Sequence, residues 1–296
     1  MNNTVIITGV NGQLGGCLQS SLPIGQWEEV LFPDRAALNL EDENQVRGFI
    51  RINKPSILLH AAAYTNVERA EEEPEMARRI NADATRWIAE ECEKIGTWLI
   101  YISTDYVFDG SKGSPYLPDD KAHPLNVYGD SKWKGEKNAL HFNTKTTVVR
   151  ASWIYSTRGK NFFKTMLALA ANREALSVVA DQWGAPTYAL SFAKDLWSMM
   201  EGNKKGEKEG LYQQVLQYSP SGITSWHGFA KAILHDFFPS VKINPVRSDA
   251  FPQKAQRPVY SKLDAGSWIL CTGVEPLTWE EQLTECKKDW ISNERN

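Results

Sequence analysis

The stretch TVIITGVNGQLGG, residues 4–16, decides how the chain folds. Its first five residues are apolar or β-branched, which is typical of a buried strand. Gly9, Gly12 and Gly15 follow directly, and residues 13–22 then show helical periodicity. Such a turn lets a phosphate approach the amides at a helix start, although three glycines also suit an ordinary turn. The stretch predicts a strand, turn and helix that can bind a nucleotide.

Strands and helices alternate through the first half of the chain. Further apolar runs are EVLFP, SILLHAA, TWLIYIST and TTVVRAS, and helical periodicity marks residues 43–52, 75–95 and 131–141. This order predicts an α/β fold: a Rossmann-like, doubly wound parallel sheet with helices on both faces.

The second half of the chain is less regular. Helices are expected at 161–172, 190–201, 224–238 and 279–291, and the charged, glycine-flanked residues 202–210 predict a solvated loop. We therefore expect an NAD(P)-binding domain over residues 1–155, to which some later segments return, and a smaller α+β substrate lobe over residues 156–296.

Composition limits the kinds of partner. The chain has 33 Lys+Arg against 36 Asp+Glu and a net charge of -3, so we expect neither nucleic-acid nor membrane-surface binding. We find no leader or bilayer-spanning run, which predicts a cytoplasmic protein. The 4 cysteines and 5 histidines lack ligand spacing, so we expect reduced thiols and no metal. The sequence leaves open whether the chain is a monomer or a homodimer.

Two further segments suit a dinucleotide. Asp34 follows the second apolar run at the distance expected of a carboxylate that binds the adenosine ribose, and Arg35 beside it could pair with a 2′-phosphate. Both NADH and NADPH therefore remain possible, and Arg35 favours NADPH. Ala61, Ala62 and Ala63 follow the third run and are small enough for a cofactor to lie against the backbone, although small residues also suit core packing.

The sequence VYGDSKWKGE, residues 127–136, places Tyr128 and Lys132 four residues apart. On a helix these side chains share a face, where an ammonium can lower the phenol's ordinary pKa of about 10. Thr104 ends the fourth apolar run, at the sheet edge where parallel sheets bind ligands. These three residues in this order predict a site that binds a carbonyl and donates a proton to it.

The chain resembles the extended short-chain dehydrogenase/reductases and, within them, the dTDP-4-dehydrorhamnose reductase family. The motifs that carry the resemblance are GVNGQLG, HAAAYTNVERAE, INADAT, STDYVFDG, PLNVYGDSKWKGE, RASWIYS, NFFKTMLALA, VVADQWGAPT and RPVYSKLD. The resemblance implies that NADPH delivers a hydride to C4 of a dTDP-linked 4-keto-6-deoxyhexose, in the biosynthesis of dTDP-rhamnose and cell-surface polysaccharide.

The resemblance also implies roles for residues. The catalytic set is Thr104, Tyr128 and Lys132. The expected cofactor contacts, with Tyr128 and Lys132, are Gly9, Gly12, Gln13, Leu14, Asp34, Arg35, Asn39, Leu40, Ala61, Ala62 and Ala63. Residues expected around the sugar, with Thr104 and Tyr128, are Val67, Glu68, Asp105, Tyr106, Asn126 and Trp153, and those expected near the diphosphate and nucleoside are Asn161, Gln182 and Arg257. Some family members use acidic residues such as those after Glu68 for magnesium, which we do not expect here.

Four other functions fit the same scaffold. Sugar-nucleotide dehydratases usually have glutamate where this chain has Tyr106, so dehydration is disfavoured. An epimerase, or another sugar-nucleotide 4-ketoreductase, remains possible. A non-catalytic regulatory subunit of methionine adenosyltransferase also resembles this family, but such a subunit has no need of an activated phenol.

Overall fold

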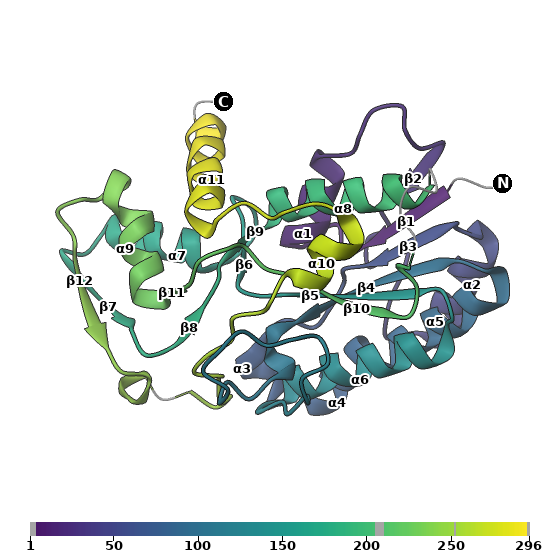
Figure 1. Cartoon of the computed structure of the whole chain (residues 1–296), viewed down its shortest axis with the longest axis horizontal. Helices are drawn as coiled ribbons and strands as arrows, with labels where there is room; N and C mark the ends of the chain where they lie inside the picture. The colour runs from purple at the N-terminus through teal and green to yellow at the C-terminus, as the bar shows by residue number, and fades with distance from the viewer. Residues whose placement is uncertain (1–3, 205–209, 252, 295–296) are drawn as a thin grey trace.

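The computed structural model describes residues 4–204, 210–251 and 253–294. One sheet of six parallel strands dominates it (Figure 1), in the order β10-β5-β4-β3-β1-β2. The strands are β1 (Thr4–Thr8), β2 (Glu29–Leu31), β3 (Ile57–His60), β4 (Trp98–Thr104), β5 (Thr146–Ala151) and β10 (Gln214–Tyr218). The sequence predicts the first five, and their order confirms the doubly wound α/β fold.

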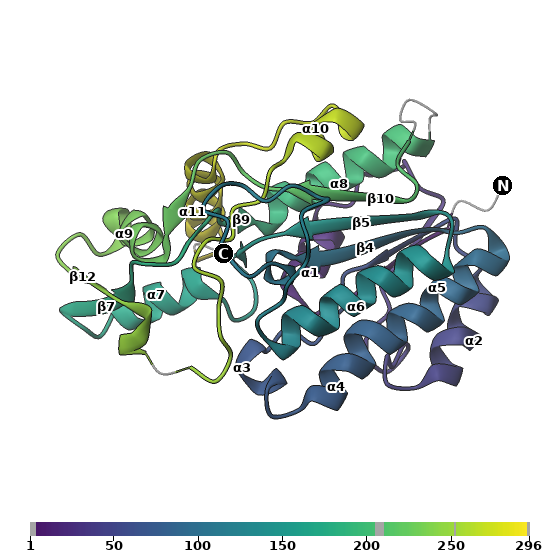
Figure 2. The same ribbon diagram turned by 60° about the horizontal axis from the view of Figure 1, so that its bottom comes forward.

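Helices cover both faces of the sheet (Figure 2). Successive residues of β1 point to opposite faces: Ile6 joins the core beneath α2, α5 and α6, and Ile7 joins the core beneath α1 and α8. These helices are α1 (Gln13–Ser20), α2 (Glu43–Asn53), α5 (Ala84–Ile95), α6 (Val127–Phe142) and α8 (Ala189–Lys204). Three shorter segments are α3 (Val67–Ala70), α4 (Pro74–Arg78) and the 3₁₀ turn η2 (Asp105–Val107).

The helix predicted over 75–95 is confirmed, although it contains the π-helical turn η1 (Arg79–Asp83) between α4 and α5. Other expected boundaries are wrong. The helix predicted over 131–141 begins at Val127, because the Asn126 side chain caps it. Residues 202–204 of the predicted loop continue α8, and 205–209 lie outside the described residues.

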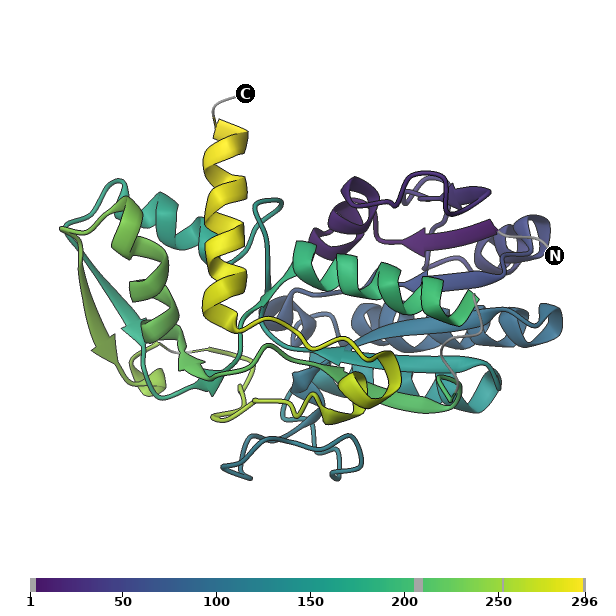
Figure 3. The same cartoon turned by 45° about the horizontal axis from the view of Figure 1, so that its top comes forward.

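A second, smaller group of elements lies beside the carboxyl edge of the sheet (Figure 3). Its strands are β6 (Ile154–Tyr155), β7 (Ala175–Val179), β8 (Trp183–Gly184), β9 (Thr187–Tyr188), β11 (Thr224–Ser225) and β12 (Lys242–Val246). Its helices are α7 (Phe162–Ala170), α9 (Trp226–Phe237) and α11 (Trp279–Glu294), together with the short turn η3 (Ser248–Ala250). The short helix α10 (Gly266–Thr272) instead packs against β10 of the large sheet. Residues of α7, α9 and α11 enclose a core of their own. The division at residue 155 stays a prediction.

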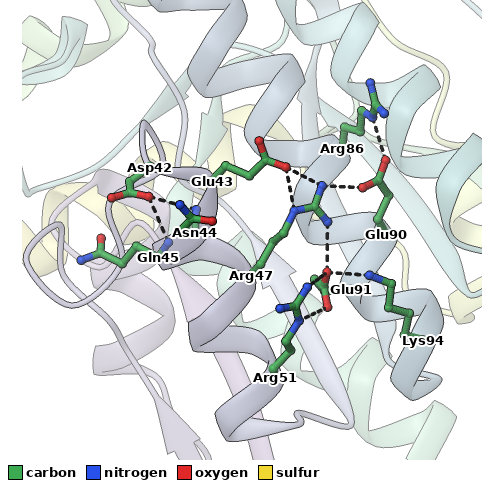
Figure 4. Close-up of polar contacts among 10 residues, drawn as sticks. All are labelled: Asp42, Glu43, Asn44, Gln45, Arg47, Arg51, Arg86, Glu90, Glu91 and Lys94. Atoms are coloured by element: carbon green, nitrogen blue, oxygen red, sulfur yellow. Dashed lines mark hydrogen bonds and ion pairs between the residues drawn. The ribbon is translucent and has the colours of Figure 1, made fainter.

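An ion-pair network ties α2 to α5 (Figure 4). The Glu91 carboxylate is 1% exposed and accepts from Arg47 at 3.0 Å, from Arg51 at 2.8 Å and from Lys94 at 2.8 Å. Hydrogen bonds from Arg51 above all lower the pKa of Glu91 to about 2, despite its burial. The carboxylate therefore stabilises the fold only while it is ionised.

Replacing Glu91 by Ala should lower the free energy of unfolding by about 1–3 kcal/mol at neutral pH. The largely buried Arg47 and the more exposed Arg51 and Lys94 would lose the acceptor that they share. Because the folded pKa is depressed, this contribution is full above the unfolded value of about 4.3 and fades as the pH falls toward about 2. Denaturant unfolding at several pH values measures it. Glu75→Ala is the matched control, since Glu75 is 87% exposed in its pair with Arg78 and should change stability little. Equal losses in the two variants would contradict the assignment.

Candidate active site

The glycine turn joins β1 to α1 with very close packing. Gly9 has a φ of +82°, and its carbonyl oxygen accepts from the Gly12 amide at 2.9 Å. A Cβ on Gly15 would lie 2.1 Å from that carbonyl oxygen, so only glycine fits there. Gly12 is the N-cap of α1 and offers no side-chain cap. No side chain of the cap residue therefore accepts a hydrogen bond from the first amides of α1, and these amides can bind an anion.

A cavity of about 510 Å³ opens at the carboxyl ends of β1, β3, β4 and β5. This is the sheet edge at which open parallel sheets bind ligands. Most of the predicted site residues line it: Gly9, Gly12, Gln13, Leu14, Ala61, Ala62, Ala63, Val67, Thr104, Asp105, Tyr106, Tyr128, Lys132 and Trp153. The fold thus brings four strand ends and the start of α6 to one space.

A second cavity, of about 210 Å³, adjoins the first along the glycine turn. Its wall includes the predicted residues Asp34, Arg35, Asn39 and Leu40. The residues common to both walls are Gly9, Asn11, Gly12, Ala62 and Ala63. Together the cavities run from the end of β2 past the glycine turn to Tyr128, which is a suitable path for an extended dinucleotide.

Asp34 and Arg35 are held in different ways at the far end of this path. Asp34 shapes its own turn, because its Oδ1 accepts from the amides of Ala36 at 3.0 Å and Ala37 at 2.9 Å. The Arg35 side chain is 77% exposed and forms an ion pair with Glu41. An anion bound at this rim would compete with Glu41 for the guanidinium.

Tyr128 lies in the first turn of α6, close beneath the end of β4. The Asn126 side chain accepts from the Gly129 amide at 2.8 Å, which fixes where the helix begins. A Cβ on Gly129 would lie 2.2 Å from the carbonyl oxygen of Tyr106, so this glycine lets α6 approach η2. The rings of Tyr106 and Tyr128 meet edge to face, with centroids 5.7 Å apart. Tight backbone packing therefore places the phenol near the threonine that ends β4.

The expectation that Lys132 lowers the pKa of Tyr128 is wrong. Burial raises the pKa of Tyr128 to about 12, and a hydrogen bond with Thr104 only partly offsets it. The Lys132 ammonium donates to the Ile102 carbonyl at 2.7 Å and lies 4.0 Å over the Tyr101 ring. Its own pKa is lowered to about 7 by burial. In this arrangement the phenol is protonated at neutral pH and able to donate.

Asp105 is a buried carboxyl group beside Thr104. The Thr104 hydroxyl donates to Asp105 Oδ1 at 3.1 Å. Burial raises the pKa of Asp105 to about 6, although hydrogen bonds from Ser261 and Thr104 act in the other direction. Ionising this group in the folded protein is therefore costly.

Because the folded pKa of Asp105 is raised above the unfolded value of about 3.9, its stabilising effect is full below that value and is lost as the pH rises through about 6. The stability of the protein relative to Asp105→Asn should therefore fall between about pH 4 and 7. Denaturant unfolding of both proteins across this range measures the difference. Parallel stability curves would contradict the raised pKa.

Five predicted residues lie outside both cavity walls. Glu68 pairs with Arg257 at 3.1 Å. The Asn126 side chain donates to the Gln256 carbonyl at 2.7 Å. Asn161 caps α7 by accepting from Lys164 at 3.1 Å, and Gln182 is buried. Their predicted roles toward a substrate stay predictions.

The cavity wall includes Gly15, the third glycine of the predicted turn. It also contains residues that are not predicted from the sequence: Asn11, Thr65, Ile102, Ser103, Ala151, Ile154, Gly159, Lys160 and Trp226. Asn11 belongs to the glycine motif and could have been found from it. Trp226 and Lys160 reach the cavity from distant segments, for which the sequence gives no signal.

Within 4–204, 210–251 and 253–294, no group of three or more His, Cys, Asp or Glu side chains could hold a metal ion. In the same ranges, no helix combines the length and apolar character needed to cross a bilayer. The 4 cysteines are free thiols, as expected.

A doubly wound parallel sheet with a glycine turn after β1, and with threonine, tyrosine and lysine on one cavity wall, is the arrangement of a short-chain dehydrogenase/reductase. Residues 3–291 match the family model described as RmlD substrate binding domain. A dTDP-4-dehydrorhamnose reductase from Aggregatibacter actinomycetemcomitans is 36% identical over 94% of this chain and 96% of its own. The spore coat polysaccharide biosynthesis protein SpsK from Bacillus subtilis is 36% identical over 95% of each chain.

A solved structure supports the same assignment. The dTDP-4-dehydrorhamnose reductase from Bacillus anthracis, in complex with NADP, is 36% identical, covers 97% of this chain and 99% of its own, and gives a TM-score of 0.88. The chain therefore belongs to the dTDP-4-dehydrorhamnose reductase family, which confirms the resemblance seen in the sequence.

Proposed function

We propose that the chain catalyses the NADPH-dependent reduction of dTDP-4-dehydro-L-rhamnose to dTDP-L-rhamnose, and so supplies a sugar nucleotide for polysaccharide biosynthesis. The observation that carries this proposal is that Thr104, Tyr128 and Lys132 line the same cavity, which leads to the glycine turn. The relatives named as reductases, similar over nearly their whole length, favour this reaction over the alternatives.

The residues along the two cavities fit a dinucleotide. Gly9, Gly12 and Gly15 leave the backbone open where a pyrophosphate would lie, since a Cβ on Gly15 would displace the turn. The amides at the start of α1 would hold the phosphates, and Asp34 and Arg35 would hold the adenosine ribose and its 2′-phosphate. NADPH supplies a hydride when it is bound there. NADH remains a possible alternative.

Thr104 and Tyr128 would bind the ketone oxygen between their hydroxyl groups. As negative charge develops on that oxygen, Tyr128 would donate its proton, which its pKa of about 12 keeps available at neutral pH. Lys132, with its pKa near 7, would return a proton to the phenolate through solvent and would bind the nicotinamide ribose. Two preplaced hydroxyl groups would thus both orient the ketone and stabilise the alkoxide.

The substrate would lie between Tyr128 and residues that follow β3, β4 and β5. Val67, Asp105, Tyr106 and Trp153 line the cavity there and would surround the hexose. The family resemblance assigns Arg257 to the diphosphate. We retain the expectations of a cytoplasmic location and of a monomer or homodimer as predictions.

Mixing the protein with dTDP-4-dehydro-L-rhamnose, and following NADPH and NADH fluorescence in parallel, tests the proposal. We expect the NADPH signal to decay in step with formation of dTDP-L-rhamnose, and the NADH signal to decay more slowly. Protein that carries tightly bound NAD and interconverts sugar epimers without net cofactor consumption would instead be an epimerase. No turnover, together with capture of a stoichiometric enzyme partner, would indicate a regulatory subunit.

A further inference from the structure

Two stacked tryptophans form part of the main cavity wall. The indoles of Trp153 and Trp226 lie face to face, with ring centroids 3.6 Å apart and planes 5° from parallel. Both side chains line the cavity. Trp153 follows β5 of the large sheet, whereas Trp226 is the first residue of α9 in the smaller group of elements. The stack therefore joins the sheet edge that carries Thr104 to the C-terminal part of the molecule.

Trp153 is held in a strained conformation from three sides. Its φ of +48° lies in the left-handed region, which is strained for a residue other than glycine. Its Nε1 donates to Ser261 Oγ at 3.2 Å. Gly184 packs against the ring so closely that a Cβ there would lie 2.7 Å from Cε2. With Trp226 against one face, the indole has little freedom to turn.

The three neighbours of Trp153 are joined to one another by backbone pairing through β8. Gly184 belongs to β8 and pairs with Thr224 of β11, which leads directly into Trp226. The Ser261 amide donates to the carbonyl of Trp183, the other residue of β8, at 2.8 Å. Trp226 is thus placed by the fold of the smaller group and not by free rotation of a surface side chain.

We propose that Trp226 is a positioning residue for the reduction, acting through Trp153. This inference rests on the proposed function, in which the Trp153 indole forms part of the wall around the hexose ring. By stacking on Trp153, Trp226 fixes the plane of that wall and therefore the distance of the reacting ketone from Tyr128. A shift of about 1 Å in such a wall can cost ~10²-fold in rate.

The test compares Trp226→Ala, Trp226→Phe and the control Trp290→Phe. The control removes an indole from α11, because Trp290 packs against Phe163 and does not line the cavity. The ultraviolet circular dichroism couplet of stacked indoles reports the stack. Initial rates give kcat and KM for dTDP-4-dehydro-L-rhamnose, and titrations give Kd for NADPH and for dTDP-L-rhamnose.

We expect Trp226→Ala to lose the couplet and ~10-fold or more of kcat/KM, with Kd for dTDP-L-rhamnose raised and Kd for NADPH within about 2-fold. Trp226→Phe should retain most of kcat because a phenyl ring still supports the indole, and Trp290→Phe should retain both couplet and activity. Lost couplet with unchanged kcat/KM and product affinity would overturn the inference, as would an equal loss of NADPH affinity.

Failure of the proposed function gives a different result. If the parent protein does not reduce the ketone at all, the reductase assignment fails. The affinity for dTDP-L-rhamnose then tests the inference by itself. A Kd that is raised in Trp226→Ala alone supports the inference, and equal Kd values in all three variants overturn it.

Discussion

Replacing Tyr128 by Phe is expected to lower kcat by ~10²-fold or more while the affinity for NADPH stays nearly unchanged. The change removes the hydroxyl group to which we assign proton donation and leaves the ring in its packed position against Tyr106. Steady-state rates and a fluorescence titration of NADPH measure the two quantities.

Tyr212→Phe is the matched control for this variant. Tyr212 is 40% exposed and does not line either of the two cavities, so its hydroxyl group should be dispensable. If Tyr128→Phe keeps the full rate, another group donates the proton and the assigned chemistry is wrong.

Replacing Gly15 by Ala should weaken NADPH binding by ~10²-fold, because the turn that receives the pyrophosphate must move. The new Cβ would lie 2.1 Å from the Gly9 carbonyl oxygen, and backbone atoms cannot yield as a flexible side chain can. Titration of NADPH fluorescence, with thermal unfolding to verify that the variant is folded, measures the effect.

Gly48→Ala provides the control, since Gly48 is also a helical glycine but has no atom within 4 Å of an added Cβ. Alanine there should add about 0.5–1 kcal/mol of stability, since it has the higher helix propensity. The affinity for NADPH should not change. A folded Gly15→Ala variant with parental affinity would show that the cofactor does not lie on this turn.

Much of the fold could be predicted because its signals are local. The five apolar runs of the first half each supply a strand, although β2 is exposed or half-buried and not buried as expected. The glycine turn follows β1 where the pattern places it. The start of α6 was misplaced because Gly129 and Asp130 are typical of turns, whereas Asn126 is also a good helix cap. The π-helical turn η1 interrupts a continuous helical pattern, and periodicity alone does not mark such an interruption.

The electrostatics of the candidate site could not be predicted from spacing. A separation of four residues correctly suggests that Tyr128 and Lys132 share a helix face, but it does not reveal how deeply either is buried. Burial is the main cause of the shifts in both pKa values, and the Ile102 carbonyl that receives the Lys132 ammonium comes from a different strand. Spacing also does not reveal that Trp226 lines the cavity, because the position of Trp226 depends on the pairing between β8 and β11.

The most direct test of the central claim follows a deuterium atom from the cofactor to the sugar. The protein is incubated with dTDP-4-dehydro-L-rhamnose and NADPH that carries deuterium at the transferred position of its nicotinamide, and the product is analysed by NMR. We predict one deuterium at C4 of the product hexose for each NADPH oxidised, and its loss together with turnover in Tyr128→Phe. Deuterium at another carbon, or product formed without any deuterium, would contradict the account.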